Sequence, residues 1–376
     1  MRIGAIKETS PGELRAALIP ASVSKLVKLG AEVVVETGLG QTIGASDEEY
    51  TKAGAQIVSR ESILCSSDIL LRVRKPSSEE VGKLKKNSIH ISFLDPFNER
   101  ELVNQLAQHN ISAISVEMIP RTTLAQKMDA LSSQANLAGY VTVILAAERS
   151  AKIFPMLMTP AGTISPARVF IIGAGVAGLQ AIATAKRLGA RVDAFDTRPV
   201  VKEQVQSLGG KFVEIDLGET GQTAQGYAKA LTPEQLEKQR QGMAKVCSQS
   251  DVVITTAQLF GRKAPIVVTK DMVAQMKPGS IIVDMAVESG GNVEGSKLNE
   301  EVITTNGVCI IGLGNLPSRV AVHASQMYAG NLTNIIEHYW NKEEKTFKLD
   351  ANDEIIKGCL ITHQGQIVNE TVKNLK

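Results

Sequence analysis

Apolar runs and helix-patterned segments alternate along the first third of the chain. Short runs rich in β-branched residues predict strands at residues 3–6, 32–36, 68–73, 89–94 and 111–117. Between them, residues 21–29 and 99–109 carry apolar side chains at helical spacing. Such alternation of strand and helix is typical of a mostly parallel α/β sheet.

A second series of strands is predicted after Pro155 and Pro160. Its members are residues 169–172, 192–196, 211–216, 251–256, 280–284 and 308–312. This number of strands, with helical crossovers, matches a doubly wound dinucleotide-binding sheet. Long helical patterns at residues 128–150 and 326–341 are expected to bridge the two series, and the alternating tail at 347–368 is expected to form a hairpin.

The predicted fold class is therefore α/β, with two Rossmann-like parallel-sheet domains joined by long helices and a cleft between them. Residues 1–135 plus 325–376 are expected to form the N-terminal domain, completed by the C-terminus, and residues 136–324 the second domain. A chain of 376 residues is too long for one hydrophobic core, which agrees with this division.

The second strand series begins with a glycine motif. The apolar run 167–172 leads directly into Gly173-Ala174-Gly175-Val176-Ala177-Gly178 and a helical pattern. In this context Gly173 permits the tight turn, Gly175 lets the backbone approach a pyrophosphate, and Gly178 lets the helix pack on the strand. The helix N-terminus would present N–H groups to the phosphates. The alternative is a turn that only packs a helix on a strand.

A carboxylate ends the next predicted strand. Asp196 lies at about the sequence distance where the motif places an acceptor for the adenosine ribose hydroxyls, followed by Thr197 and Arg198. Arg198 is the kind of residue that accommodates a 2′-phosphate, whereas Asp196 repels one. Because the carboxylate ends the strand, the sequence favours NAD(H) over NADP(H).

A polar insertion, residues 217–241, separates the third and fourth strands of this series. It contains glycines around Tyr227, among them Gly226. Long insertions at the ligand-binding end of a sheet are more often functional than decorative. We expect this loop to close over a bound nucleotide, with Tyr227 as an aromatic lid.

Composition and charge exclude several classes of function. With a net charge of +2 and charges of both signs interspersed, the sequence shows no basic region that would indicate binding to nucleic acid or to an anionic membrane surface. The four cysteines are far apart and predict neither disulfides nor a metal site. His323 and His338 are expected to be structural. The uncharged run 131–147 contains polar residues and is expected to be a buried helix, and no signal peptide is indicated.

Four stretches carry a resemblance that covers essentially the whole chain: residues 120–133, 195–205, the loop at 226–227, and 314–320. They resemble the NAD-binding soluble domain of proton-translocating nicotinamide nucleotide transhydrogenase, whose wider family includes alanine dehydrogenase. The resemblance implies a dimeric NAD(H)-binding module that passes hydride to NADP(H) on another subunit, coupled to proton movement through membrane subunits. It also implies a separately encoded chain, soluble in isolation, held at the cytoplasmic side of the inner membrane by its partners.

The resemblance also implies a nicotinamide site. Arg121, Gln126 and Asp129 occupy the positions of the family's Arg-Gln-Asp loop, and Ser132 follows where a nicotinamide contact is expected. A primary carboxamide offers donors and acceptors that such side chains satisfy jointly. Gln126 is therefore assigned to nicotinamide positioning, with no acid/base residue. The alternative is a capped helix start with Asp129 near the first turn.

Two departures from the pattern of alanine dehydrogenases argue against amino-acid oxidation. Lys7, Glu8 and Arg15 resemble the family's N-terminal signature, in which alanine dehydrogenases use the arginine for a substrate carboxylate; without it they would be taken as surface charges. However, residues 72–76, Arg-Val-Arg-Lys-Pro, stand where those enzymes carry a substrate-binding lysine, and Asp95 replaces a catalytic histidine. Neither replacement is a base poised near neutrality. An alanine-dehydrogenase-like oxidoreductase and a non-catalytic NAD-sensing module remain the alternatives.

Overall fold

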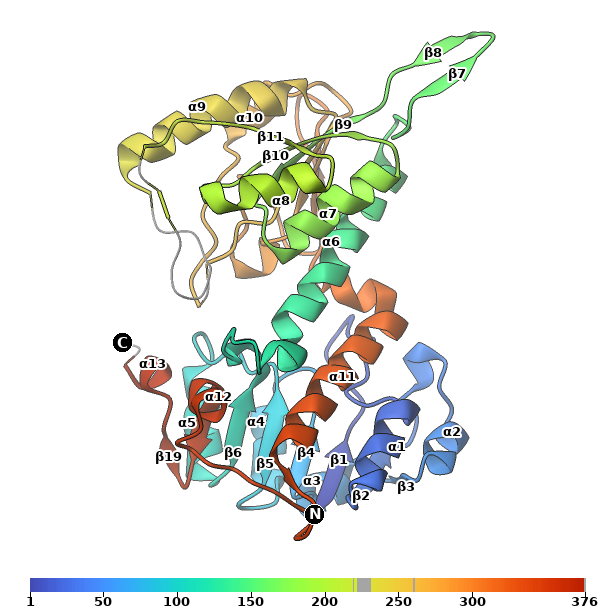
Figure 1. Ribbon diagram of the computed structural model, residues 1–376, viewed down its shortest axis with the longest axis vertical. Coiled ribbons are helices and arrows are strands. Elements are labelled where there is room, and N and C mark those ends of the chain that lie inside the picture. Colours follow the sequence, from blue (N-terminus) through green and yellow to red (C-terminus); the bar gives the residue numbers. More distant parts are fainter. Residues whose placement is uncertain (219, 222–230, 260, 375–376) are drawn as a thin grey trace. The chain divides into compact units, whose positions relative to one another are not determined.

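The chain folds into two compact α/β units (Figure 1). The computed structural model describes residues 1–218, 220–221, 231–259 and 261–374. Unit 1 comprises Met1–Gln134 and Ser318–Lys376, and unit 2 comprises Ala135–Pro317. The chain enters unit 2 within α6 (Ala130–Arg149) and returns through η6 (Leu316–Val320) and α11 (Ala321–Tyr339). The boundaries predicted from sequence, at 135/136 and 324/325, lie inside α6 and α11.

Unit 1 is built on an eight-stranded sheet of order β19-β18-β6-β5-β4-β1-β2-β3. Its strands are β1 (Arg2–Ala5), β2 (Glu32–Glu36), β3 (Gln56–Val58), β4 (Ile69–Leu71), β5 (Ile89–Ser92), β6 (Ser112–Ser115), β18 (Leu360–His363) and β19 (Gln366–Ile367). Strands β1 to β6 pair in parallel, whereas β18 lies antiparallel to β6 and β19. The C-terminal hairpin thus extends the N-terminal sheet.

Helices cover both faces of this sheet. Val33 and Val35 of β2 join the core beneath α1 (Pro20–Lys28), α11 and α12 (Glu354–Cys359), whereas Val34 joins the opposite core. That second core includes side chains of α3 (Arg60–Ser66), α4 (Ser78–Lys83), α5 (Arg100–Gln108) and α13 (Glu370–Lys373). Because side chains alternate along a strand, one continuous apolar run supplies both cores. Helix α2 (Asp47–Lys52) and the pair β16 (Trp340–Asn341) and β17 (Thr346–Phe347) complete the unit.

Unit 2 contains a seven-stranded sheet of order β11-β10-β9-β12-β13-β15-β14. Its strands are β9 (Arg168–Ile172), β10 (Arg191–Phe195), β11 (Lys211–Phe212), β12 (Val252–Thr255), β13 (Ile281–Asp284), β14 (Glu300–Ile303) and β15 (Cys309–Gly312). All pair in parallel except the edge strand β14. The predicted strands are present, although that expected at 211–216 ends at Phe212. The strand order reverses at β9, between β10 and β12, where open α/β sheets bind ligands.

The faces of this sheet are covered by α6, α7 (Val176–Arg187) and α8 (Lys202–Ser207) on one side and by α9 (Pro233–Gln249) and α10 (Lys270–Ala274) on the other. The hairpin of β7 (Leu157–Thr159) and β8 (Gly162–Ile164) projects from the unit with all its residues exposed (Figure 1). The sequence pattern did not predict it, because its strands bury no face in this chain.

Helix α6 is the one described helix whose length and apolar composition would suffice to cross a membrane. Half of the apolar window is buried within the structure. The core helix of a globular protein meets the same criteria, and Thr142 and Ala146 of α6 are completely buried.

Candidate functional site

The glycine turn of unit 2 has the conformation that its sequence requires. Gly173 has φ +100°, and its N–H donates to the carbonyl of Phe195 at 2.8 Å. A Cβ on Gly173 would lie 2.4 Å from Thr256 Oγ1, and one on Gly178 would lie 1.9 Å from the Gly173 carbonyl oxygen. Both positions therefore exclude any side chain, and β9 is joined tightly to α7.

Gly175 differs from its neighbours because it borders open space. A Cβ built on Gly175 would meet nothing within 4 Å. Gly175 is the N-cap of α7, and no side chain among the described residues caps this helix start. The first N–H groups of a helix need partners and attract anions. An open, uncapped helix start behind a tight turn fits a pyrophosphate, so the turn can hold a dinucleotide.

Asp196 follows β10 and connects directly to this turn. Its Oδ2 accepts a hydrogen bond from the Ala174 N–H at 2.8 Å, and its side chain is only 7% exposed. The Arg198 guanidinium donates to both carboxylate oxygens, from Nε at 2.9 Å and from Nη2 at 2.7 Å. These hydrogen bonds raise the pKa of Arg198. The Thr197 carbonyl accepts from the Thr220 hydroxyl at 2.7 Å, so the whole segment is held in place.

In unit 1, the loop expected to bind nicotinamide leads into α6. Asp129 Oδ1 accepts from the Ser132 N–H at 2.8 Å, and Oδ2 accepts from the Ser132 hydroxyl at 2.6 Å. Asp129 therefore makes the contacts of a helix N-cap. Since the Ser132 proton is donated to Asp129, the oxygen of Ser132 keeps its capacity to accept from an amide N–H. Arg121 and Gln126 are exposed on the same loop.

The loop is anchored from below by α11. The Lys127 carbonyl accepts from Asn331 Nδ2 at 2.8 Å and from Asn334 Nδ2 at 3.0 Å. Ala125 and Met128 are buried in the core of unit 1. The backbone around Gln126 is therefore fixed while its side chain stays accessible. Sequence reasoning missed both asparagines, because a side chain that binds a distant carbonyl leaves no local motif.

Gly226 and Tyr227 lie outside the described residues. The expectation that their loop closes over a nucleotide stays a prediction.

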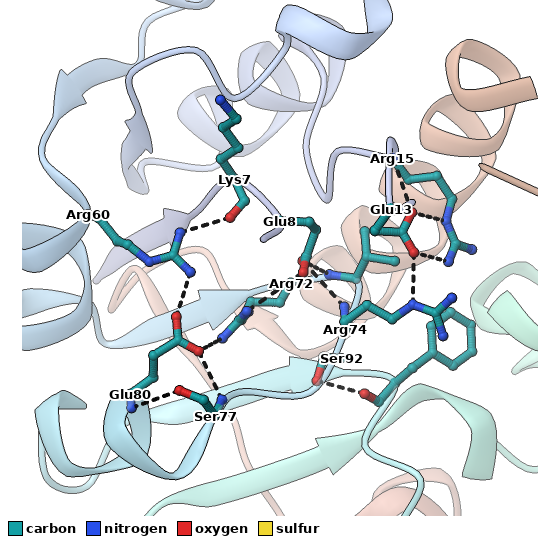
Figure 2. Close-up of polar contacts among 12 residues, drawn as sticks. Lys7, Glu8, Glu13, Arg15, Arg60, Arg72, Arg74, Ser77, Glu80 and Ser92 are labelled. Carbon is teal, nitrogen blue, oxygen red and sulfur yellow. Dashed lines mark hydrogen bonds and ion pairs between the residues drawn. The ribbon is translucent and has the colours of Figure 1, made fainter. Parts of the chain in front are cut away.

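A cluster of buried charges lies beyond the ends of β1 and β4 in unit 1 (Figure 2). Glu8 and Arg15, which the local sequence would place at the surface, are only 8% and 5% exposed. Arg15 donates to both oxygens of Glu13, at 2.7 and 2.6 Å, and Arg74 Nε donates to Glu13 at 2.8 Å. Although burial opposes ionisation, Arg15 and Arg74 hold the pKa of Glu13 down at about 2. Contacts with residues far along the chain, from Arg74 to Glu13 and from Arg15 to Gln134, explain why these charges are buried although the local sequence alone would place them at the surface.

A second group within the cluster borders a pocket of about 570 Å³. Arg72 donates to Glu80 at 2.7 Å and lies 3.6 Å from Glu8, whose other oxygen accepts from the Val73 N–H at 2.6 Å. Arg60 also pairs with Glu80, at 2.5 Å (Figure 2). Burial raises the pKa of Glu8, whereas Arg72 and other donors hold that of Glu80 at about 2 against burial. The arginines that line the pocket are thus neutralised within the protein.

Asp95 lies at the carboxyl end of β5 with a left-handed backbone, φ +52°. The partly buried Glu117 accepts from the Asp95 N–H and fixes this conformation. Lys75 Nζ lies 4.0 Å from the Asp95 carboxylate and 2.5 Å from that of Glu99. Burial raises the pKa of Asp95, and the Asn98 amide and Lys75 act against this.

These features define a protein with two Rossmann-like α/β units and, in the second, a glycine turn of the dinucleotide-binding type. Residues 4–138 match the family described as "Alanine dehydrogenase/PNT, N-terminal domain", and residues 142–370 match "Alanine dehydrogenase/PNT, C-terminal domain". The chain therefore belongs to the alanine dehydrogenase/PNT family.

Individual relatives place the chain within this family. It is 45% identical to the first portion of NAD(P) transhydrogenase subunit alpha of Rhodospirillum rubrum, with 98% of each chain covered. It is 28% identical to alanine dehydrogenase of Mycobacterium tuberculosis, covering 99% of this chain and 96% of the relative. The solved transhydrogenase from Sinorhizobium meliloti is 42% identical, with a TM-score of 0.88, covering 98% of this chain and 100% of that chain. The identities are higher with the transhydrogenases.

Proposed function

We propose that this chain is the NAD(H)-binding subunit of a proton-translocating NAD(P)+ transhydrogenase. It would exchange hydride between NAD(H) in this chain and NADP(H) on a partner subunit, coupled to proton translocation by membrane subunits. The observation that carries this proposal is the glycine turn at Gly175, open to solvent, with the Asp196 carboxylate bonded to its Ala174 N–H. Relatives named NAD(P) transhydrogenase subunit alpha support the choice within the family.

In this proposal, residues of this chain bind the dinucleotide and orient its nicotinamide ring. The turn at Gly175 and the N-terminus of α7 would hold the pyrophosphate, and Asp196 the adenosine ribose. The carboxamide would be held by side chains of the anchored loop, which would so set which face of the ring is presented: Arg121, Gln126, Asp129 and Ser132. Asp129 also holds Ser132 through two hydrogen bonds. Bound NAD(H) supplies the hydride chemistry. Positioning is most of what direct transfer requires from the protein, so no proton-transferring residue is assigned.

Unit 1 provides the argument against alanine oxidation. Arg15 and Arg74 both bind Glu13, which remains ionised because its pKa is about 2. A substrate carboxylate would have to compete with this buried anion for both arginines. Arginine also cannot act as a base. A carboxyl such as that of Asp95 ordinarily has a lower pKa than the imidazole of histidine, so it does not replace the histidine as a base near neutral pH.

The partners follow from the same proposal. An NADP(H)-binding subunit and an integral membrane proton-channel subunit would hold this chain at the cytoplasmic face of the inner membrane. A homodimer is supported by the β7–β8 hairpin, on which Leu157, Met158 and Ile164 are all exposed. Apolar side chains gathered on a projecting arm are typical of a contact with another chain.

The proposal is tested by mixing the purified chain with a separately purified NADP(H)-binding subunit. We expect hydride exchange between the two nucleotides that needs both proteins, and no NADH from L-alanine and NAD+. Alanine oxidation by the chain alone would favour an alanine-dehydrogenase-like enzyme instead. NADH binding without any exchange, with a partner known to be active, would favour a nucleotide-sensing module.

A further inference from the structure

Asn292 fixes the backbone that follows β12. Its Oδ1 accepts from the Ala257 N–H at 3.0 Å, and its Nδ2 donates to the Ala257 carbonyl and to the Pro265 carbonyl, both at 2.8 Å. The side-chain amide thus pairs with both polar groups of one residue and ties in a second segment of the same loop. Asn292 is completely buried, so water does not compete for these bonds.

Asn292 is in turn held by Asp284, the last residue of β13. The Asp284 carboxylate accepts from the Asn292 N–H at 2.9 Å and from the Val293 N–H at 3.2 Å. It also accepts from the Ala286 N–H at 3.0 Å, and the Thr255 hydroxyl lies 3.4 Å away. Asp284 is completely buried, and a buried polar side chain is tolerated where hydrogen-bond donors surround it, as they do here. A rigid chain of contacts therefore runs from β13 through Asn292 to Ala257.

Ala257 lies at the glycine turn. The preceding residue, Thr256, donates from its N–H to the Ile172 carbonyl at 2.8 Å and from its hydroxyl to the Gly173 carbonyl at 3.0 Å. A Cβ on Gly173 would lie 3.5 Å from the Ala257 nitrogen. The backbone that Asn292 holds is therefore the wall of the turn on the β12 side, at the point where the strand order reverses.

We propose that Asn292 is a positioning residue for the nicotinamide half of the dinucleotide. This rests on the proposed binding of NAD(H) at the glycine turn. Asp196 lies at the end of β10, so the adenosine half of the dinucleotide would lie on the β10 side of β9. The nicotinamide half would then extend over β12, on the other side of β9. Within the part of the chain that the structure describes, the Asn292 side chain bonds to Ala257 and Pro265, so it acts through the Ala257 peptide on the β12 side of the turn. Loss of its amide should therefore weaken contacts to one half of the ligand only.

The test compares two ligands on the full chain by calorimetry: NADH, and 5′-AMP as a probe of the adenosine half. In Asn292→Ser, a hydroxyl cannot pair with both groups of Ala257, and we expect the Kd for NADH to rise about tenfold while that for 5′-AMP changes less than about twofold. Asn292→Asp, which places an acceptor against two carbonyls, should show the same selectivity. Thermal unfolding in the absence of ligand establishes which variants fold.

Asn306 provides the matched control. Its Nδ2 also binds backbone carbonyls, of Val273 at 3.0 Å and Met276 at 3.3 Å, but it precedes β15, at the opposite end of the sheet from the glycine turn. Asn306→Ser should lower stability without changing either Kd by more than about twofold. In the unmodified chain, slow hydrogen exchange of the Ala257 N–H, lost in Asn292→Ser, supports the same contact independently of nucleotide.

Equal weakening of NADH and 5′-AMP in the Asn292 variants, or unchanged affinity for both, would overturn the positioning role. Fast exchange of the Ala257 N–H in the unmodified chain would also overturn it. Failure of the unmodified chain to bind NADH would instead refute the proposed function, and with it this inference. The unmodified chain therefore separates the two failures.

Discussion

The carboxylate of Asp196 is bound by the guanidinium of Arg198, two residues further along the chain, through contacts of 2.9 and 2.7 Å. The pair holds together the two groups that favour opposite cofactors: a carboxylate for a ribose hydroxyl and a guanidinium for a 2′-phosphate. In this arrangement the Asp196 carboxylate neutralises the charge of Arg198. The same carboxylate is connected to the glycine turn because it accepts a hydrogen bond from the Ala174 N–H.

We therefore predict that Asp196→Asn weakens NADH binding about tenfold and strengthens NADPH binding, because it removes the repulsive charge and releases Arg198. Calorimetric titration with both nucleotides measures the change. Asp193→Asn, on the same strand, is the control and should leave both affinities unchanged. An unaltered NADH to NADPH preference in Asp196→Asn would contradict this assignment.

The loop that contains Gln126 and Asp129 allows its proposed role in nicotinamide binding to be separated from helix capping. Gln126 is exposed, so Gln126→Ala should leave the unfolding temperature unchanged and slow hydride exchange with the partner subunit about tenfold or more, because ring orientation is lost. Asp129→Ala should additionally lower the free energy of unfolding by about 1 kcal/mol through loss of the cap. Lys127→Ala is the control, since only its carbonyl is bound by α11. Exchange at the normal rate in Gln126→Ala would remove Gln126 from the site.

The Glu13 cluster predicts a specific sensitivity to acid. Because the folded-state pKa of Glu13 is about 2, below its ordinary value of 4.5, the stabilisation is complete above pH 4.5 and is lost as the pH falls to about 2. The loss should amount to roughly 3 kcal/mol. Urea unfolding followed against pH measures it. Glu13→Gln should be destabilised at neutral pH and should lack this component, whereas Glu79→Gln, at an exposed pair, should retain it. The same acid dependence in Glu13→Gln would contradict the assignment.

The β7–β8 hairpin predicts self-association. Met158 is 75% exposed on this hairpin, so Met158→Asp should shift the chain from dimer to monomer in sedimentation analysis. Ile303→Asp is a matched control, because Ile303 is 68% exposed on the edge strand β14 of the same unit. If Met158→Asp leaves the dimer intact, or if both variants dissociate alike, the hairpin is not the contact.

Sequence patterns predicted the elements that bury continuous apolar runs. Strands such as β9 and β12 were found because their β-branched residues supply both cores of unit 2. The short strands β3 and β14 and the exposed β7–β8 hairpin were missed, because they bury too little to leave a pattern.

In the candidate site, too, some features could be predicted from the sequence and others could not. The glycine turn and Asp196 form a local motif with a stated geometry, so their proximity could be predicted. The partners that hold the site could not: Asn331 lies far along the chain from Lys127, as does Asn292 from Ala257. Bonds between a side chain and a distant backbone depend on the tertiary fold. Residue types alone also gave no sign that Glu8 and Arg15 are buried.

The proposed function requires this chain to position a nicotinamide for direct hydride transfer and to move no proton itself. It is tested most directly with NADH that carries deuterium at the transferable position of the ring, mixed with NADP+, the chain and a separate NADP(H)-binding subunit. Mass spectrometry of the NADPH formed should show the deuterium transferred in full, with none released to water and with no requirement for an amino acid. Label lost to solvent, or NADPH formed without deuterium, would contradict direct hydride transfer between the two nucleotides.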